Sequence, residues 1–72
     1  MIDLSSKGLR CRAFREIRTN WGMVTSSTGG TIQYEIENLG RNLIFVEWDN
    51  GLSMFVFPNE IEIIGGDLLL WQ

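Results

Sequence analysis

The 72-residue chain is 44% hydrophobic and 21% charged, which predicts one small globular domain and excludes a disordered chain. Six Lys and Arg against nine Asp and Glu give a net charge of −3, and this acidic balance argues against a nucleic-acid-binding protein. With no His and a single Cys, the chain lacks a His general base, an internal disulfide and a multi-cysteine zinc site, so we expect neither an enzyme nor a metal or cofactor site.

The first predicted strand covers residues 9–13, where apolar side chains at the odd positions alternate with arginines. This period of two places Cys11 in the core and the arginines in solvent. Residues 19–30 then form a polar stretch that is long for a connection in a compact domain, and such loops often carry function. Within this predicted loop, Trp21 is a large apolar residue in polar surroundings.

A second strand is predicted at residues 31–37, which alternate apolar and polar side chains. The alternation places Ile32, Tyr34 and Ile36 together on one half-buried face of the strand. The Asn, Gly and Arg residues at 38–42 predict a turn after it.

The remaining strands follow at short intervals. Residues 43–48 are more apolar and predict a central strand, and the Asp-Asn-Gly sequence at 49–51 predicts a hairpin because Asn and Gly tolerate positive φ. The return strand covers residues 52–57. It ends at Pro58, which cannot donate a hydrogen bond to a ladder, and we expect one helical turn there. Residues 61–64 resume the alternation as a short last strand.

Five short strands with tight turns predict a small, partly open all-β barrel. The element order resembles the SH3-like barrel, with its long loop after the first strand at residues 19–30, its distal hairpin at 49–51 and its one-turn helix at 58–60. We expect a single SH3-like domain of five to six antiparallel strands over residues 1–72. Its core would cover about residues 8–64, followed by an apolar tail.

Three segments, at residues 29–32, 44–51 and 57–63, resemble small bacterial SH3-like families. One is the SH3-like subunit of the photosynthetic NADH-dehydrogenase-like complex, which docks ferredoxin. The other is the nitrogenase-accessory NifZ family, in which an Ile-Arg-Asn stretch precedes a Gly-rich loop, as the Ile-Arg-Thr-Asn at residues 17–20 does here. The resemblance covers about half of the chain and implies an accessory or docking protein of a larger, redox-related assembly.

The best candidate site surrounds Trp21, because Trp and Arg dominate the hot spots of protein interfaces. The residues expected to anchor a protein partner, or to shape its groove, are Arg15, Arg18, Asn20, Trp21, Tyr34 and Trp48. In the alternative interpretation, Trp21 folds back and caps the barrel.

Charge is unevenly distributed along the chain. Residues 1–30 carry five basic and two acidic residues, whereas residues 31–72 carry one basic and seven acidic ones. Two interpretations fit: cross-strand ion pairs within the sheet, or a basic patch for an acidic partner. The basic first strand and the aromatic loop also define the alternative function, a small-barrel nucleic-acid-binding protein whose aromatic side chains stack on bases.

An apolar run close to the C-terminus predicts either a sixth strand that completes the core or an interface in a homo-oligomer. The run consists of Leu68, Leu69, Leu70 and Trp71. No apolar run in the chain reaches the length of a signal peptide or of a spanning helix. Together with the free thiol of Cys11, this predicts a protein of the reducing cytoplasm.

Overall fold

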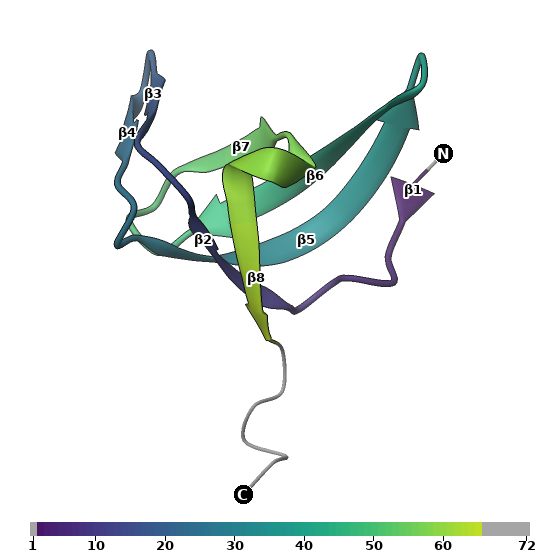
Figure 1. Cartoon of the computed structure of the whole chain (residues 1–72), viewed down its shortest axis with the longest axis horizontal. Coiled ribbons are helices and arrows are strands. Elements are labelled where there is room, and N and C mark those ends of the chain that lie inside the picture. Colours follow the sequence, from purple (N-terminus) through teal and green to yellow (C-terminus); the bar gives the residue numbers. More distant parts are fainter. Residues whose placement is uncertain (1, 66–72) are drawn as a thin grey trace, which may run out of the picture.

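The computed structural model describes residues 2–65 of the chain (Figure 1). This part contains eight strands and one 3-10 turn, joined by loops and turns. In chain order the elements are β1 (Ile2–Asp3), β2 (Arg10–Ala13), β3 (Ile17–Thr19), β4 (Gly22–Val24), β5 (Gly29–Asn38), β6 (Arg41–Trp48), β7 (Ser53–Val56), η1 (Pro58–Glu60) and β8 (Ile61–Gly65). The predicted all-β chain with one helical turn before its last strand is confirmed. The predicted tail at Leu68, Leu69, Leu70 and Trp71 lies outside the described residues.

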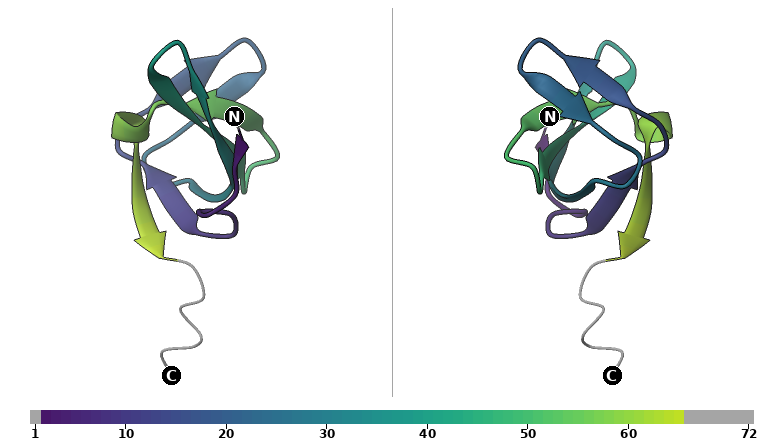
Figure 2. Two further views of the ribbon diagram at one scale, coloured as in Figure 1. Left: turned by 90° about the vertical axis from the view of Figure 1, so that its right-hand side faces the viewer. Right: turned by 90° about the vertical axis from the view of Figure 1, so that its left-hand side faces the viewer.

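Six of the strands form one antiparallel sheet in the order β7-β6-β5-β2-β8, with β1 paired to the far part of β5. The long β5 organises this sheet, because it pairs with β2 at its start and with β6 along most of its length. Figure 2 shows the strands curling around a common centre, with η1 at one side. β7 and β8 are the two ends of the strand order, so the sheet is open between them over residues 2–65.

The core lies inside this curl and draws one to three residues from each of β2, β4, β5, β6, β7 and β8. Its buried members are Cys11, Ala13, Val24, Ile32, Ile44, Val46, Trp48, Val56 and Ile61. The alternation read from residues 9–13 is thereby confirmed, since Cys11 and Ala13 point inward and Arg12 points to solvent.

A β-bulge in β5 changes which face its side chains occupy. Ile32 pairs with Val46, but Tyr34 pairs with the adjacent Phe45, so Gln33 is an extra residue on the β5 side. Beyond the bulge, Tyr34 stacks on Phe45 on the outer face of the sheet, with ring centroids 5.2 Å apart, while Ile32 is buried inside. The prediction that Ile32, Tyr34 and Ile36 share one face is therefore wrong, because a bulge shifts the period of two by one residue.

The segment predicted as a long polar loop, residues 19–30, contains β4 and the last residue of β3, and these two strands form a second sheet. β3 and β4 pair antiparallel, with Ile17 opposite Val24 and Thr19 opposite Gly22. Val24 is fully buried and fixes the base of this hairpin to the core. The hairpin projects from the main sheet at the upper left of Figure 1.

Candidate functional site

Trp21 lies at the turn of the β3–β4 hairpin, where the residue is 83% exposed. Two hydrogen bonds order this turn: the Trp21 backbone N–H donates to Thr19 Oγ1 (3.1 Å), and the Thr19 hydroxyl donates to the Gly22 carbonyl oxygen (2.8 Å). Gly22 has a φ of +148°, a conformation that favours glycine. Trp21 therefore projects from an ordered turn. It does not fold back onto the core formed within residues 2–65, so the alternative in which Trp21 caps the barrel is wrong for the described structure.

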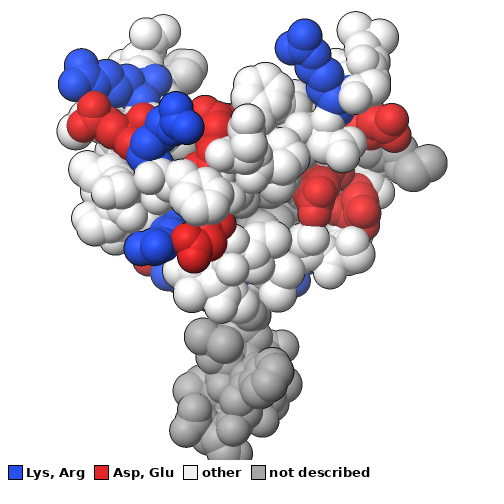
Figure 3. Space-filling view, in the orientation of Figure 1, with Lys and Arg blue, Asp and Glu red and all other residues white. Residues whose placement is uncertain are grey.

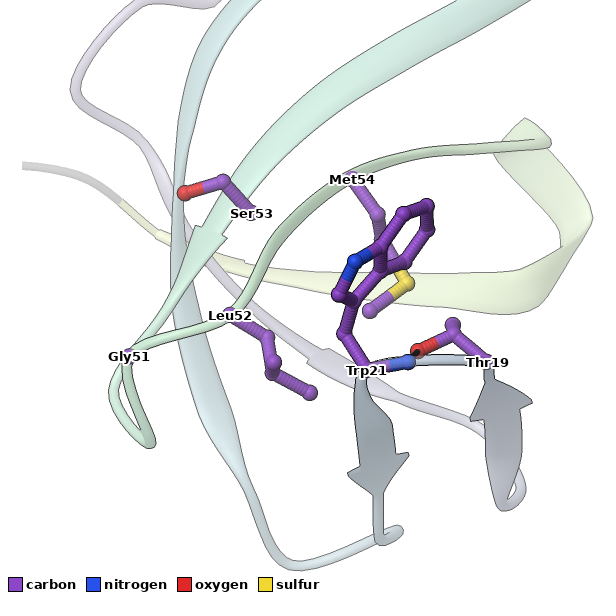
Figure 4. Close-up of a pocket in the computed structure, with 6 residues that line it drawn as sticks. All are labelled: Thr19, Trp21, Gly51, Leu52, Ser53 and Met54. Carbon is purple, nitrogen blue, oxygen red and sulfur yellow. Dashed lines mark hydrogen bonds between the residues drawn. The ribbon is translucent and has the colours of Figure 1, made fainter.

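An apolar pocket of about 370 Å³ lies between this turn and the start of β7. Its lining residues are Thr19, Trp21, Gly51, Leu52, Ser53 and Met54. In Figure 4 the indole ring of Trp21 stands beside the Met54 side chain, with Leu52 nearer the base of the hairpin. The exposed Trp21 thus forms one wall of a hollow rather than an isolated apolar surface.

The two walls of this pocket are tied together by the β6–β7 turn. Asn50 Nδ2 donates to the Met23 carbonyl oxygen (3.0 Å), and Asn50 Oδ1 accepts from the Leu52 backbone N–H (3.1 Å). Gly22 packs closely on Leu52, because a Cβ built at Gly22 would lie 3.1 Å from Leu52 Cδ1. The Asp-Asn-Gly sequence thus makes the predicted hairpin turn and also positions the pocket.

Of the six residues predicted for the site, Trp21 is the one that lines this pocket. Arg15, Arg18 and Asn20 are exposed but lie outside it. Arg18 Nε instead contacts Glu16 Oε1 at 2.9 Å, and Arg15 lines a separate hollow.

The two predicted groove residues from the sheet also lie elsewhere. Tyr34 belongs to an outer-face aromatic cluster with Phe45 and Phe55, whose ring centroids are 4.9 to 6.0 Å apart. Trp48 is 1% exposed and is the largest fully buried side chain, so it belongs to the core and shapes no groove. Its predicted burial is confirmed, but its predicted binding role is wrong, because its strand position points it inward.

Half of the six basic residues form ion pairs. Arg10 makes a two-pronged contact with Asp49, with Nη2–Oδ2 at 2.6 Å and Nη1–Oδ1 at 3.0 Å. Hydrogen bonds from Arg10 hold the pKa of Asp49 below its usual value. Arg12 Nη2 lies 3.1 Å from Glu62 Oε1 on the adjacent β8. The arginines of β2 therefore pair across strands, as the first interpretation of the charge asymmetry predicts.

Sequence analysis missed Leu52 and Met54, which form the other wall of the pocket. They come about 30 residues after Trp21. Period-two alternation assigns side chains to the faces of one strand, but it does not say which separate segments meet. The Asp-Asn-Gly turn beside Leu52 is the signal that comes nearest to locating this wall.

The single thiol of the chain lies in the core. Cys11 is fully buried, and burial raises the pKa of its thiol to about 11, so the thiolate that nucleophilic chemistry needs is disfavoured. Over residues 2–65, no three His, Cys, Asp or Glu side chains gather as a metal site. A helix of the length and hydropathy needed to cross a bilayer was not found in the same range.

Comparisons of the chain with protein-family models, curated proteins and solved structures found no match.

Proposed function

We propose that the domain is a non-catalytic docking module of a larger assembly, in which Trp21 and the pocket beside it bind a protein partner. The observation that carries this proposal is the exposure of Trp21, a residue that is 83% exposed at the edge of an apolar pocket. Burying a tryptophan against a partner removes a large apolar area from water, and tryptophan is among the commonest hot-spot residues.

The order of the pocket walls supports this role. Thr19 holds the Trp21 turn from one side, and Asn50 links the β6–β7 turn to the same hairpin. A contact residue that is already positioned loses less conformational entropy on binding than one on a mobile loop. A partner side chain can therefore enter the pocket between Trp21 and Leu52 without a large rearrangement.

We further propose that the sheet is an SH3-like small barrel. Three features support this finer assignment: the strand order β7-β6-β5-β2-β8, the hairpin inserted between β2 and β5, and the 3-10 turn directly before β8. The two accessory families that the sequence resembles support placement in a larger, redox-related assembly, although a fold by itself does not determine a function. The free thiol of Cys11 supports a reducing, cytoplasmic setting for that assembly.

The arrangement of charge weakens the nucleic-acid alternative. Arg10 and Arg12 are engaged with Asp49 and Glu62, so β2 does not offer a free basic stripe for a phosphate backbone. Acidic residues also outnumber basic ones over the whole chain.

The docking proposal is tested by affinity capture from native extract with the wild-type chain, Trp21→Ala and Leu39→Ala, at low and at high salt. Leu39 is the matched control, because it is 95% exposed but lines none of the pockets described here. We expect a protein partner that survives high salt and is lost with Trp21→Ala alone. Equal capture by both variants, or capture of nucleic acid only at low salt, would contradict the proposal.

A further inference from the structure

A second surface lies over η1, where two hollows share Phe57 and Asn59. One hollow, of about 220 Å³, is lined by Arg15, Phe57, Asn59 and Glu60. The other, of about 450 Å³, is lined by Arg41, Asn42, Phe57, Pro58 and Asn59. Because they meet at Phe57 and Asn59, we treat them as one groove, called the η1 groove, and it shares no residue with the Trp21 pocket.

Each of the two hollows of the η1 groove is lined by one arginine, Arg15 in the smaller and Arg41 in the larger. Neither Arg15 nor Arg41 has an acidic side chain within ion-pair distance among the described residues, in contrast to Arg10, Arg12 and Arg18. Figure 3 shows blue side chains toward the upper left and beside the tip of the β5–β6 hairpin, with both white and red surface between them. The two arginines outside ion pairs therefore line one hollow each, and Glu60 is the acidic residue that shares the hollow of Arg15.

The middle of the groove is apolar and ordered. Phe57 is 43% exposed there, next to Pro58. Glu60 is the one acidic residue among the lining residues, and its Oε1 accepts a hydrogen bond from the Phe57 backbone N–H (2.8 Å). The Glu60 carboxylate thus stabilises the turn that presents Phe57.

We propose that the η1 groove binds an acidic segment of a protein partner, with carboxylates on Arg15 and Arg41 and an apolar side chain on Phe57. Arginine presents several N–H donors in a planar fork that matches a carboxylate, which makes it suited to this recognition. The chain has a net charge of −3, so its overall field does not attract an acidic partner and the selectivity has to be local. This proposal does not depend on the Trp21 pocket.

The test is an NMR titration of the ¹⁵N-labelled full chain with a synthetic peptide of sequence EELED. Binding is monitored through the changes in the amide chemical shifts of the chain. We expect the largest shifts at Phe57, Asn59 and Glu60, and weaker shifts with the uncharged peptide QQLQN. Arg15→Gln and Arg41→Gln should each weaken EELED binding about fivefold, the scale of one exposed charge pair. Arg18→Gln is the control, because Arg18 is exposed but lies outside the groove.

Several results would overturn the proposal. Among them are no saturable shift with EELED at millimolar concentration, equal binding of QQLQN, and equal weakening by Arg18→Gln. A single-stranded DNA oligomer that shifts the same amides more strongly than EELED would assign the groove to nucleic acid instead. Shifts confined to Trp21, Leu52 and Met54 would reject the groove proposal but leave the docking proposal intact. Conversely, an affinity capture that finds no Trp21-dependent partner would reject the docking proposal but leave the groove proposal intact.

Discussion

At Gly30 the fold has no room for a side chain. A Cβ at this position would lie 2.6 Å from Val46 Cγ1 and 2.7 Å from Trp48 Cε3, and both atoms belong to fully buried side chains. The backbone of β5 therefore passes directly against the Trp48 ring, and this close approach requires glycine.

Gly30→Ala is predicted to lower the free energy of unfolding by about 2 kcal/mol, because overpacking a dense core typically costs about 1–3 kcal/mol. Denaturant unfolding followed by circular dichroism measures the change. Gly29→Ala is the matched control: its Cβ would meet Arg10 Nη2 and Asp49 Oδ2, which are ends of exposed side chains that can move. An equal loss for both variants would show that the close approach at Trp48 is not the cause.

At the scale of elements, the Arg10–Asp49 pair links β2 to the turn that directly follows β6, and β2 and β6 are not neighbours in the sheet. The β6 end is also tied to β5, since the Asp49 backbone N–H donates to the Gly29 carbonyl oxygen (2.9 Å). The pair therefore helps to curl the sheet, although both side chains remain partly exposed.

Asp49→Asn should reduce stability at neutral pH by less than about 1 kcal/mol, because the pair is screened by solvent. The Arg10 hydrogen bonds lower the pKa of Asp49 in the folded state, so their stabilisation is present above the ordinary Asp pKa and is lost as pH falls below about 4. Unfolding measured at several pH values should show the two proteins converging in acid. A difference that stays constant into acid would contradict the ionic origin.

How well the elements could be predicted depended on whether their signal is local. The Asp-Asn-Gly turn and Pro58 predict the β6–β7 hairpin and η1, because each acts through the φ and hydrogen-bonding limits of its own residues. The bulge at Gln33 depends instead on register between β5 and β6, and no local pattern marks it. The β3–β4 hairpin was missed because its strands have three residues each, too few for alternation to stand out.

At the scale of the whole molecule, the candidate surfaces are made by segments that are distant in the sequence. Sequence analysis identified Trp21 from its apolar character in a polar stretch, and identified Arg15 as part of the same site. The fold separates them, placing Trp21 beside Leu52 and Arg15 beside Phe57. Such groupings follow from the curl of the sheet, which local patterns of alternation and turn residues do not reveal.

The central claim is that Trp21 serves binding rather than folding, and the free energy of unfolding of Trp21→Ala tests it most directly. The account predicts a change within about 0.5 kcal/mol of wild type, the usual range for surface substitutions. A loss of about 3–5 kcal/mol, as for a tryptophan removed from a core, would contradict it. In that case Trp21 would be a structural residue, and the docking surface would have to be sought elsewhere on the sheet.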